Sequence, residues 1–339
     1  MAISFGSLFT GFGGADIGAI TAGMTPAWGI EYDPEIAAVA NANLGDHVTV
    51  ANLLRCSPSD FAPVDVLHAS PPCPNFSVAK IGGKEDALDF MLAGKVAQFI
   101  SVLQPRIFTL ENVWAYRNSQ SWAGIRNAIE RAGYWYDVAH VNAADFGVPQ
   151  TRQRMIVRAL RGSMVPPLPP AEPWVGWYDA IADLVDDLPE TTFAKWQLAR
   201  LPAELRTMLV SNAKTEYSDG VRERDEPALC ATPQQSGRLR AFIMGKNNNK
   251  YGDGTRRSSE QAQTIGANEH GSKAFVAGRT VAITPRCLSR FQSFPDRYEL
   301  PRRKTLAARG IGNAVPPLLM EKIYKQLLLC TDLPERGNP

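Results

Sequence analysis

Long apolar runs are missing from this chain: no stretch approaches the roughly 20 residues that a membrane-spanning helix needs. The five cysteines are odd in number and contain no C-x-x-C pair, which argues against a disulfide framework and against a zinc site. The first residues carry no basic segment ahead of an apolar one, so a secretory signal is not expected. These absences lead us to expect a metal-free protein of a reducing cytoplasm, with no membrane partner.

The net charge of the whole chain is small, at +2, but the charged residues are unevenly distributed along it. Residues 1–150 hold 8 Lys/Arg and 14 Asp/Glu, whereas residues 151–339 hold 28 and 20. The basic second half suggests a polyanionic partner such as nucleic acid. Ordinary variation of surface charge would give the same imbalance, so the other features of the sequence have to decide.

Strand-like and helix-like segments alternate through the first half of the chain. Strands are expected near 3–9, 27–33, 47–54, 64–69, 107–113, 135–142 and 154–160, and helices near 34–45, 90–105, 121–134 and 314–330. This alternation predicts an α/β fold with a doubly wound, mostly parallel, Rossmann-like sheet.

A proline-rich bridge near 161 leads into an irregular, turn-forming region that extends to 278. We therefore expect a catalytic domain of residues 1–160 plus 300–330, and a smaller, irregular domain of residues 161–299. A weak similarity between 225–242 and 259–275 is compatible with two similar hairpins or with coincidence.

A glycine-rich turn with the sequence "FTGFGG" (9–14) follows the first strand. Such a turn lets the backbone approach a ligand, and Glu31, at the end of the next strand, is placed to bind ribose hydroxyls. The third glycine of the dinucleotide pattern is replaced by Asp16, which we expect to repel a pyrophosphate. The turn therefore favours S-adenosylmethionine over a nicotinamide cofactor.

Three further segments gain meaning only together. "PPC" (71–73) places a thiol after a strand, "LENV" (110–113) places Glu111 at the end of another strand on the same sheet edge, and "PQTRQR" (149–154) puts Gln150, Arg152 and Arg154 on one face of an extended segment. Taken singly, Cys73 could be a buried small hydrophobe, Glu111 an ordinary acid at a strand end, and the arginines a solvated face.

Six motifs in order resemble the DNA (cytosine-5) methyltransferase family. They are "FTGFGGADIG", "PPCPNFS", "ENV", "QTRQR", "TPRCLSRFQSFPD" and "GNAVPP", and the resemblance covers residues 3–160 and 279–328. It implies an enzyme of bacterial or phage type that transfers a methyl group from S-adenosylmethionine to C5 of cytosine in a specific double-stranded DNA sequence. The family flips the target base out of the duplex, and residues 161–278 fall where it keeps its variable target-recognition region.

The resemblance also implies residue roles. Cys73 would add to C6 of the base, Glu111 would contact N3 and the exocyclic amine, Arg154 would hold O2, and Arg152 would support the catalytic loop. The implied cofactor-binding residues are Phe9, Gly11, Phe12, Gly13, Gly14, Glu31, Tyr32, Asn52, Pro72, Asn313 and Val315. The candidate DNA-binding residues are Ser77, Lys80, Gln150, Arg238, Arg240, Lys246, Arg256 and Arg257.

Two positions depart from the family pattern. Pro74 stands where the family usually has Gln, and Asn52 stands where it often has Asp. Two related hypotheses remain open: an RNA cytosine-5 methyltransferase, whose Cys-Phe-Thr signature is absent from this sequence, and a non-catalytic DNA-binding relative. One recognition region serves one flipped base, so a monomer is expected to suffice.

Overall fold

A seven-stranded sheet forms the centre of the protein. The structure is a computed structural model, and it describes residues 2–72, 85–193, 198, 242–244, 255–257, 260–262, 272–276 and 279–329. The sheet strands are β1 (Ser4–Leu8), β2 (Thr25–Glu31), β3 (Val48–Val50), β4 (Val66–Ala69), β5 (Ile107–Asn112), β6 (Tyr134–Asn142) and β7 (Gln153–Arg161). Their spatial order is β3-β2-β1-β4-β5-β7-β6.

All neighbouring strands pair in parallel except β7, which runs antiparallel to both β5 and β6. The strand order reverses between β1 and β4, and ligands bind outside the carboxyl ends of the strands at such a switch point. The expected doubly wound, mostly parallel sheet is confirmed.

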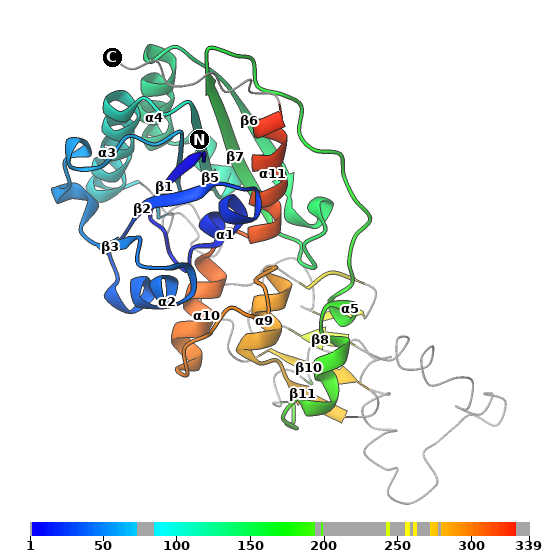
Figure 1. Cartoon of the computed structure of the whole chain (residues 1–339). Helices are drawn as coiled ribbons and strands as arrows, with labels where there is room; N and C mark the ends of the chain where they lie inside the picture. The colour runs from blue at the N-terminus through cyan, green and yellow to red at the C-terminus, as the bar shows by residue number, and fades with distance from the viewer. Residues whose placement is uncertain are drawn as a thin grey trace, which may run out of the picture.

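Helices cover both faces of this sheet (Figure 1). The pair α3 and α4 covers one face and the pair α1 and α11 covers the other, each over its own apolar cluster. The helices are α1 (Gly14–Thr21), α2 (Pro34–Leu44), α3 (Ala87–Leu103), α4 (Gln120–Arg131) and α11 (Pro317–Leu329). A Cβ on Gly18 would lie 2.8 Å from the Met320 Cβ, so α1 approaches α11 closely because this position carries no side chain.

Element boundaries differ from the expectations where capping residues decide them. The second strand ends at Glu31 instead of 33 because the Asp33 side chain accepts hydrogen bonds from the Glu35 and Ile36 amides and so begins α2. Helix α3 begins at Ala87 instead of 90 because Asp86 and Asp89 form a capping box.

The molecule has two lobes: the large lobe holds the seven-stranded sheet, and the small lobe holds a second, smaller sheet (Figure 1). Its order is β11-β10-β8-β9, with β8 (Phe242–Met244), β9 (Thr255–Arg257), β10 (Lys273–Val276) and β11 (Arg279–Ala282), and every pair is antiparallel. The short helix α5 (Trp177–Ile181) and helix α9 (Pro285–Phe291) pack beside it. The similarity between 225–242 and 259–275 falls largely outside the described residues.

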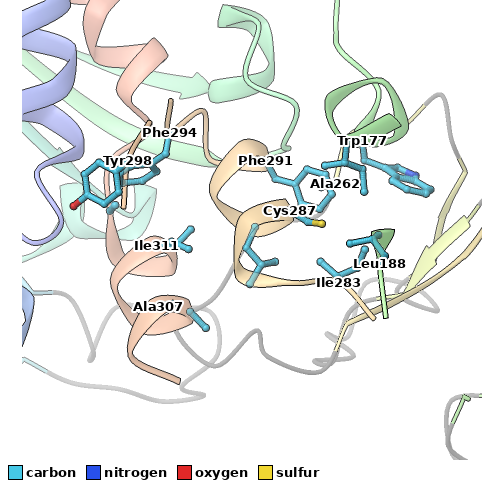
Figure 2. Packing of buried hydrophobic residues seen from close by; sticks show 14 of the residues in the cluster. Trp177, Leu188, Ala262, Ile283, Cys287, Phe291, Phe294, Tyr298, Ala307 and Ile311 are labelled. Carbon is cyan, nitrogen blue, oxygen red and sulfur yellow. The ribbon is translucent and has the colours of Figure 1, made fainter. Parts of the chain in front are cut away.

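One apolar cluster joins the small lobe to the large one. Figure 2 shows it running from Trp177 through α9 to Ile311 on α10 (Lys304–Asn313) and to Tyr298. Helix α10 therefore packs with the small lobe as well as with Phe12 of the glycine-rich turn, which is in the same cluster. Within the small lobe, Arg290 on α9 forms ion pairs with Asp183 and Asp296.

Candidate active site

Two turns face each other across the switch point of the large sheet. Residues 9–13 follow β1, and residues 70–72 follow the neighbouring strand β4. The first turn needs unusual backbone angles, because Phe9, Gly11 and Gly13 all have φ between 60° and 72°. Gly13 begins α1 in this left-handed conformation, which explains the glycine there.

The Glu31 carboxylate is held beside the glycine turn. Its two oxygens accept hydrogen bonds from the Gly11 amide at 2.9 Å and the Asp33 amide at 2.9 Å. Each carboxylate oxygen keeps a lone pair for a hydroxyl donor. Tyr32 beside it is exposed, and Asn52, after β3, accepts a hydrogen bond from the Leu54 amide through its side-chain oxygen.

Asp16 does not point toward the mouth of the glycine turn. Its side chain is fully buried, and its Oδ1 lies 3.0 Å from both Ser7 Oγ on β1 and His47 Nε2. The position of the missing third glycine is thus used for close helix–strand contact, made here by a hydrogen bond. The expectation that this carboxylate would repel a pyrophosphate stays a prediction, and the repulsion would act through the interior and not by direct contact.

Phe12 likewise differs from its expected role. Its ring is fully buried in the cluster that joins the two lobes. It lies directly against Gly310 of α10, where a Cβ would clash with the ring. Its carbonyl oxygen accepts a hydrogen bond from Tyr298 Oη at 2.7 Å. The Phe12 side chain therefore anchors the turn and does not line a cofactor pocket.

The turn after β4 is held on two sides. The Ser70 amide donates to the Leu8 carbonyl of β1 at 3.3 Å, and Asn112 Nδ2 of β5 donates to the Pro71 carbonyl at 3.2 Å. Pro71 is buried and Pro72 is exposed. The turn therefore carries the chain out of the sheet edge immediately ahead of Cys73.

Glu111 and Arg154 meet at this same edge. Glu111 is the last residue but one of β5, and Arg154 is near the beginning of β7, which reaches the same edge because it runs antiparallel. Glu111 Oε1 lies 2.9 Å from Arg154 Nε, yet among the described residues this buried oxygen has no directed hydrogen bond. A buried acceptor in this state suits an incoming N–H donor.

The segment before Arg154 links the site to other parts of the chain. Arg152 is buried, and its Nη1 donates to the Gly312 carbonyl at 3.1 Å. Gln150 is fully buried, and its Nε2 donates to the Phe291 carbonyl and to Gln292. The expected DNA contact of Gln150 does not fit this placement, because the small lobe covers the side chain.

The remaining predicted residues divide into two groups. Asn313 is exposed at the end of α10, while the backbone of Val315 lies against Gly14, where a Cβ would clash with the Val315 carbonyl. Arg256 is half-buried in β9, and its carbonyl accepts from Trp177 Nε1. The following lie outside the described residues, or have side chains that do: Cys73, Ser77, Lys80, Arg238, Arg240, Lys246 and Arg257.

The described part of the chain shows neither a metal cluster nor a membrane-spanning helix. It contains no cluster of three or more His, Cys, Asp or Glu side chains that could hold a metal ion. None of its helices is both long and apolar enough to cross a bilayer.

Two functional candidates were missed by the reasoning from sequence. Asn112 holds the turn ahead of Cys73, and His68 lies in hydrogen-bond contact with the first residue of that turn. The only available signal was a polar residue inside an otherwise apolar strand end, which does not reveal the partner.

Known proteins are similar to this chain in sequence and in fold. The family model described as C-5 cytosine-specific DNA methylase matches residues 3–329. Among curated relatives, the Type II methyltransferase M1.HphI of Haemophilus parahaemolyticus is 26% identical, over 97% of this chain and 87% of its own. M.HpaII of Haemophilus parainfluenzae is 28% identical, over 96% of this chain and 89% of its own.

Solved structures share the fold at low sequence identity. The Entamoeba histolytica methyltransferase EhMeth superposes with a TM-score of 0.63 at 14% identity, over 97% of this chain and 98% of that one. The Schizosaccharomyces pombe Dnmt2 methyltransferase gives 0.58 at 16% identity, over 96% and 98%. With the family model covering nearly the whole sequence, this chain belongs to the C-5 cytosine-specific DNA methylases, which methylate cytosine at C5 in DNA.

Proposed function

We propose that this DNA cytosine-5 methyltransferase uses Cys73 as a nucleophile, with S-adenosylmethionine bound between the turns after β1 and β4. The observation that carries the proposal is the buried Glu111 oxygen beside Arg154, at the sheet edge where the Pro71–Pro72 turn leads to Cys73. An acid, a guanidinium and the approach to a thiol converge there from β5, β7 and β4.

The turns at the switch point fit S-adenosylmethionine. The stretches 9–13, 31–33, 51–52 and 70–72 carry two acids, Glu31 and Asp33, and no Lys or Arg. Such surroundings suit a ligand with a positive sulfonium and no phosphate. Glu31 would accept from the ribose hydroxyls, and Phe9, Tyr32, Asn52 and Pro72 would border the adenosine. S-adenosylmethionine would supply the methyl group.

The base chemistry explains the residue types at the edge. C5 of cytosine is a weak nucleophile, and a thiolate bond from Cys73 to C6 would turn C5 into an enamine-like carbon that accepts a methyl group. Glu111 would accept the exocyclic N–H and stabilise positive charge at N3, while Arg154 would donate to O2. Loss of the C5 proton would then expel the thiolate and restore the aromatic ring.

The small lobe is the proposed target-recognition domain. The target base has to leave the duplex, at a cost of roughly a few kcal/mol. The small lobe must therefore bind DNA beside the sheet edge that carries Glu111 and Arg154. It already reaches that edge, because the Thr151 amide donates to the Ala262 carbonyl and the Ala262 amide donates to the Pro149 carbonyl. One such lobe serves one flipped base, so we propose that a monomer is active on double-stranded DNA.

The first test is base-resolution mapping of modified cytosines. Plasmid DNA would be taken from methylation-free bacteria that express the wild type or Cys73→Ala. We expect methylcytosine at one short motif with the wild type only, while purified Cys73→Ala still binds S-adenosylmethionine and DNA. Near-normal methylation by Cys73→Ala would end the assignment of the nucleophile.

A further inference from the structure

A row of buried polar side chains crosses the large sheet at one level. Ser7 pairs with His68, His68 with Thr109, and Thr109 with Arg158, on β1, β4, β5 and β7. Residues paired in neighbouring strands point to the same face of a sheet. The row therefore places polar side chains in a buried, otherwise apolar layer between the sheet and its helices. Each of these side chains needs a hydrogen-bond partner there.

His68 uses both ring nitrogens. Its Nδ1 lies 2.8 Å from Thr109 Oγ1, and its Nε2 lies 2.8 Å from Ser70 Oγ. Thr109 Oγ1 in turn lies 3.4 Å from Tyr324 Oη on α11. The chain of contacts thus runs from α11, through the interior of the sheet, to the first residue of the turn after β4.

The ring is neutral at physiological pH, because burial lowers the pKa of His68 to about 3. One nitrogen then donates and the other accepts, so the ring can satisfy Thr109 and Ser70 at the same time. A base this weak does not take up the proton released from C5 at neutral pH. The geometry therefore indicates a structural contact toward the turn and not a proton acceptor.

Ser70 is the hinge between the rigid strand and the two prolines. The Ser70 amide donates to the Leu8 carbonyl, and the Ser70 hydroxyl is hydrogen-bonded to His68. The carbonyl of the next residue, Pro71, accepts from Asn112. Because Pro71 and Pro72 have restricted φ angles, a rotation at Ser70 would be passed on to the following residue with little relaxation.

We infer that His68 is a positioning residue, whose hydrogen bond to Ser70 fixes the direction in which the Pro71–Pro72 turn presents Cys73 to the base. The inference rests on the proposed role of Cys73. A displacement of about 1 Å at a reacting group can lower a rate by about 10²-fold, so loss of this contact acts on the covalent step and leaves ligand binding intact.

The test measures formation of the covalent adduct. The full-length protein, S-adenosylmethionine and a duplex with 5-fluorocytosine at the mapped site would be mixed. Fluorine blocks the final elimination because it cannot leave as a cation, so the Cys–C6 adduct accumulates. The variants are Ser70→Ala, His68→Asn and His68→Gln. The amide of Gln reaches the position of Nε2 and keeps the Ser70 contact, whereas that of Asn reaches only the position of Nδ1.

We expect Ser70→Ala and His68→Asn to slow adduct formation roughly 10- to 100-fold, while dissociation constants for S-adenosylmethionine and DNA stay within about twofold. His68→Gln should retain most of the rate. Ser70→Ala combined with His68→Asn should be no slower than either alone, because both remove one contact. Asp137→Asn is the control: it disturbs Arg158 at the far end of the same row and should keep the wild-type rate.

Two results would overturn the inference in different ways. Wild-type adduct rates in Ser70→Ala and His68→Asn, or equal losses in His68→Gln and His68→Asn, would leave His68 without a positioning role. Methylation of ordinary DNA by the wild type with no adduct on fluorinated DNA would instead refute the covalent route itself, and this inference with it.

Discussion

Among single side chains, Glu111 has the most clearly defined chemical task. Replacing it by Gln keeps the shape, but it removes the negative charge and presents an amide donor where an acceptor is needed. We expect Glu111→Gln to lower the methylation rate by about 10²- to 10⁴-fold, with S-adenosylmethionine affinity unchanged. Single-turnover methylation and calorimetry would measure the two quantities.

The matched control is Glu130→Gln on the exposed surface of α4, where Glu130 pairs with Arg126. This variant should methylate at the wild-type rate. Equal activity of Glu111→Gln and Glu130→Gln would show that Glu111 takes no part in the reaction.

His68 also predicts a pH dependence of stability. The pKa of His68 is about 3 in the folded state, because the ring is buried, against about 6.5 in the unfolded chain. The unfolded chain therefore takes up a proton first as the pH falls, and stability decreases below pH 6.5. This histidine should make the free energy of unfolding about 2 kcal/mol lower at pH 5 than at pH 8.

Urea titrations of the wild type and His68→Gln at both pH values would measure this difference, which the variant should lack.

His47→Gln provides a contrast of opposite sign. Burial opposes charging of His47, but the hydrogen bond that the ring donates to Asp16, the charge of Asp16 and the neighbouring backbone carbonyls together outweigh burial and raise the pKa of His47. Its contribution is present below pH 6.5 and is lost as the pH rises through the folded-state value. An identical pH dependence in the wild type and His68→Gln would contradict the prediction.

Among helices and strands, the contact between α1 and α11 depends on the absence of a side chain at Gly18. A Cβ there would lie 2.8 Å from the Glu321 amide nitrogen and 2.8 Å from the Pro317 carbonyl oxygen. We expect Gly18→Ala to destabilise the fold by about 1–3 kcal/mol through overpacking, measured by urea unfolding.

Gly94 offers the matched control inside α3, because a Cβ there meets nothing within 4 Å. Gly94→Ala should stabilise the protein by about 0.5–1 kcal/mol, since alanine favours a helix. Equal effects of the two substitutions would mean that helix propensity, and not the helix contact, governs Gly18.

The order of strands and helices in the large sheet followed from local pattern, whereas the meeting of Glu111 and Arg154 at one edge was implied only by the family resemblance. Alternation of short apolar strands with capped helices is written in neighbouring residues. The antiparallel direction of β7 cannot be read from neighbouring residues, although this direction brings Arg154 to the same edge as Glu111. Burial of Phe12 and Gln150 depends on Tyr298 and Phe291, more than 100 residues away, so no local signal could reveal it.

For the entire chain, the division of labour between the lobes predicts the result of a segment exchange. An exchange ending at 278 would separate β10 from β11, which are paired, so the better segment runs from Trp174 to Ala282. Replacing it by the corresponding segment of a relative with a different target site should change the methylated sequence and preserve cytosine-5 chemistry.

Base-resolution mapping would measure the target sequence of the chimaera, and thermal unfolding would verify that it folds. A chimaera that folds and still methylates the original motif would show that recognition lies outside residues 174–282. Loss of all methylation in a folded chimaera would point to the contacts between Ala262 and residues 149–151 as a coupling that must be matched.

The polar row across the large sheet also bears on how the chain selects its folded state. β1, β4, β5 and β7 are far apart in sequence, and parallel strands could pair with their neighbours one residue out of step. A slip of β4 by one position would move His68 to the apolar face under α3 and bring Leu67 against Asp16 and Tyr324. Each polar group stranded in this way would cost about 1–3 kcal/mol, so the row penalises misaligned pairings while the sheet is still assembling.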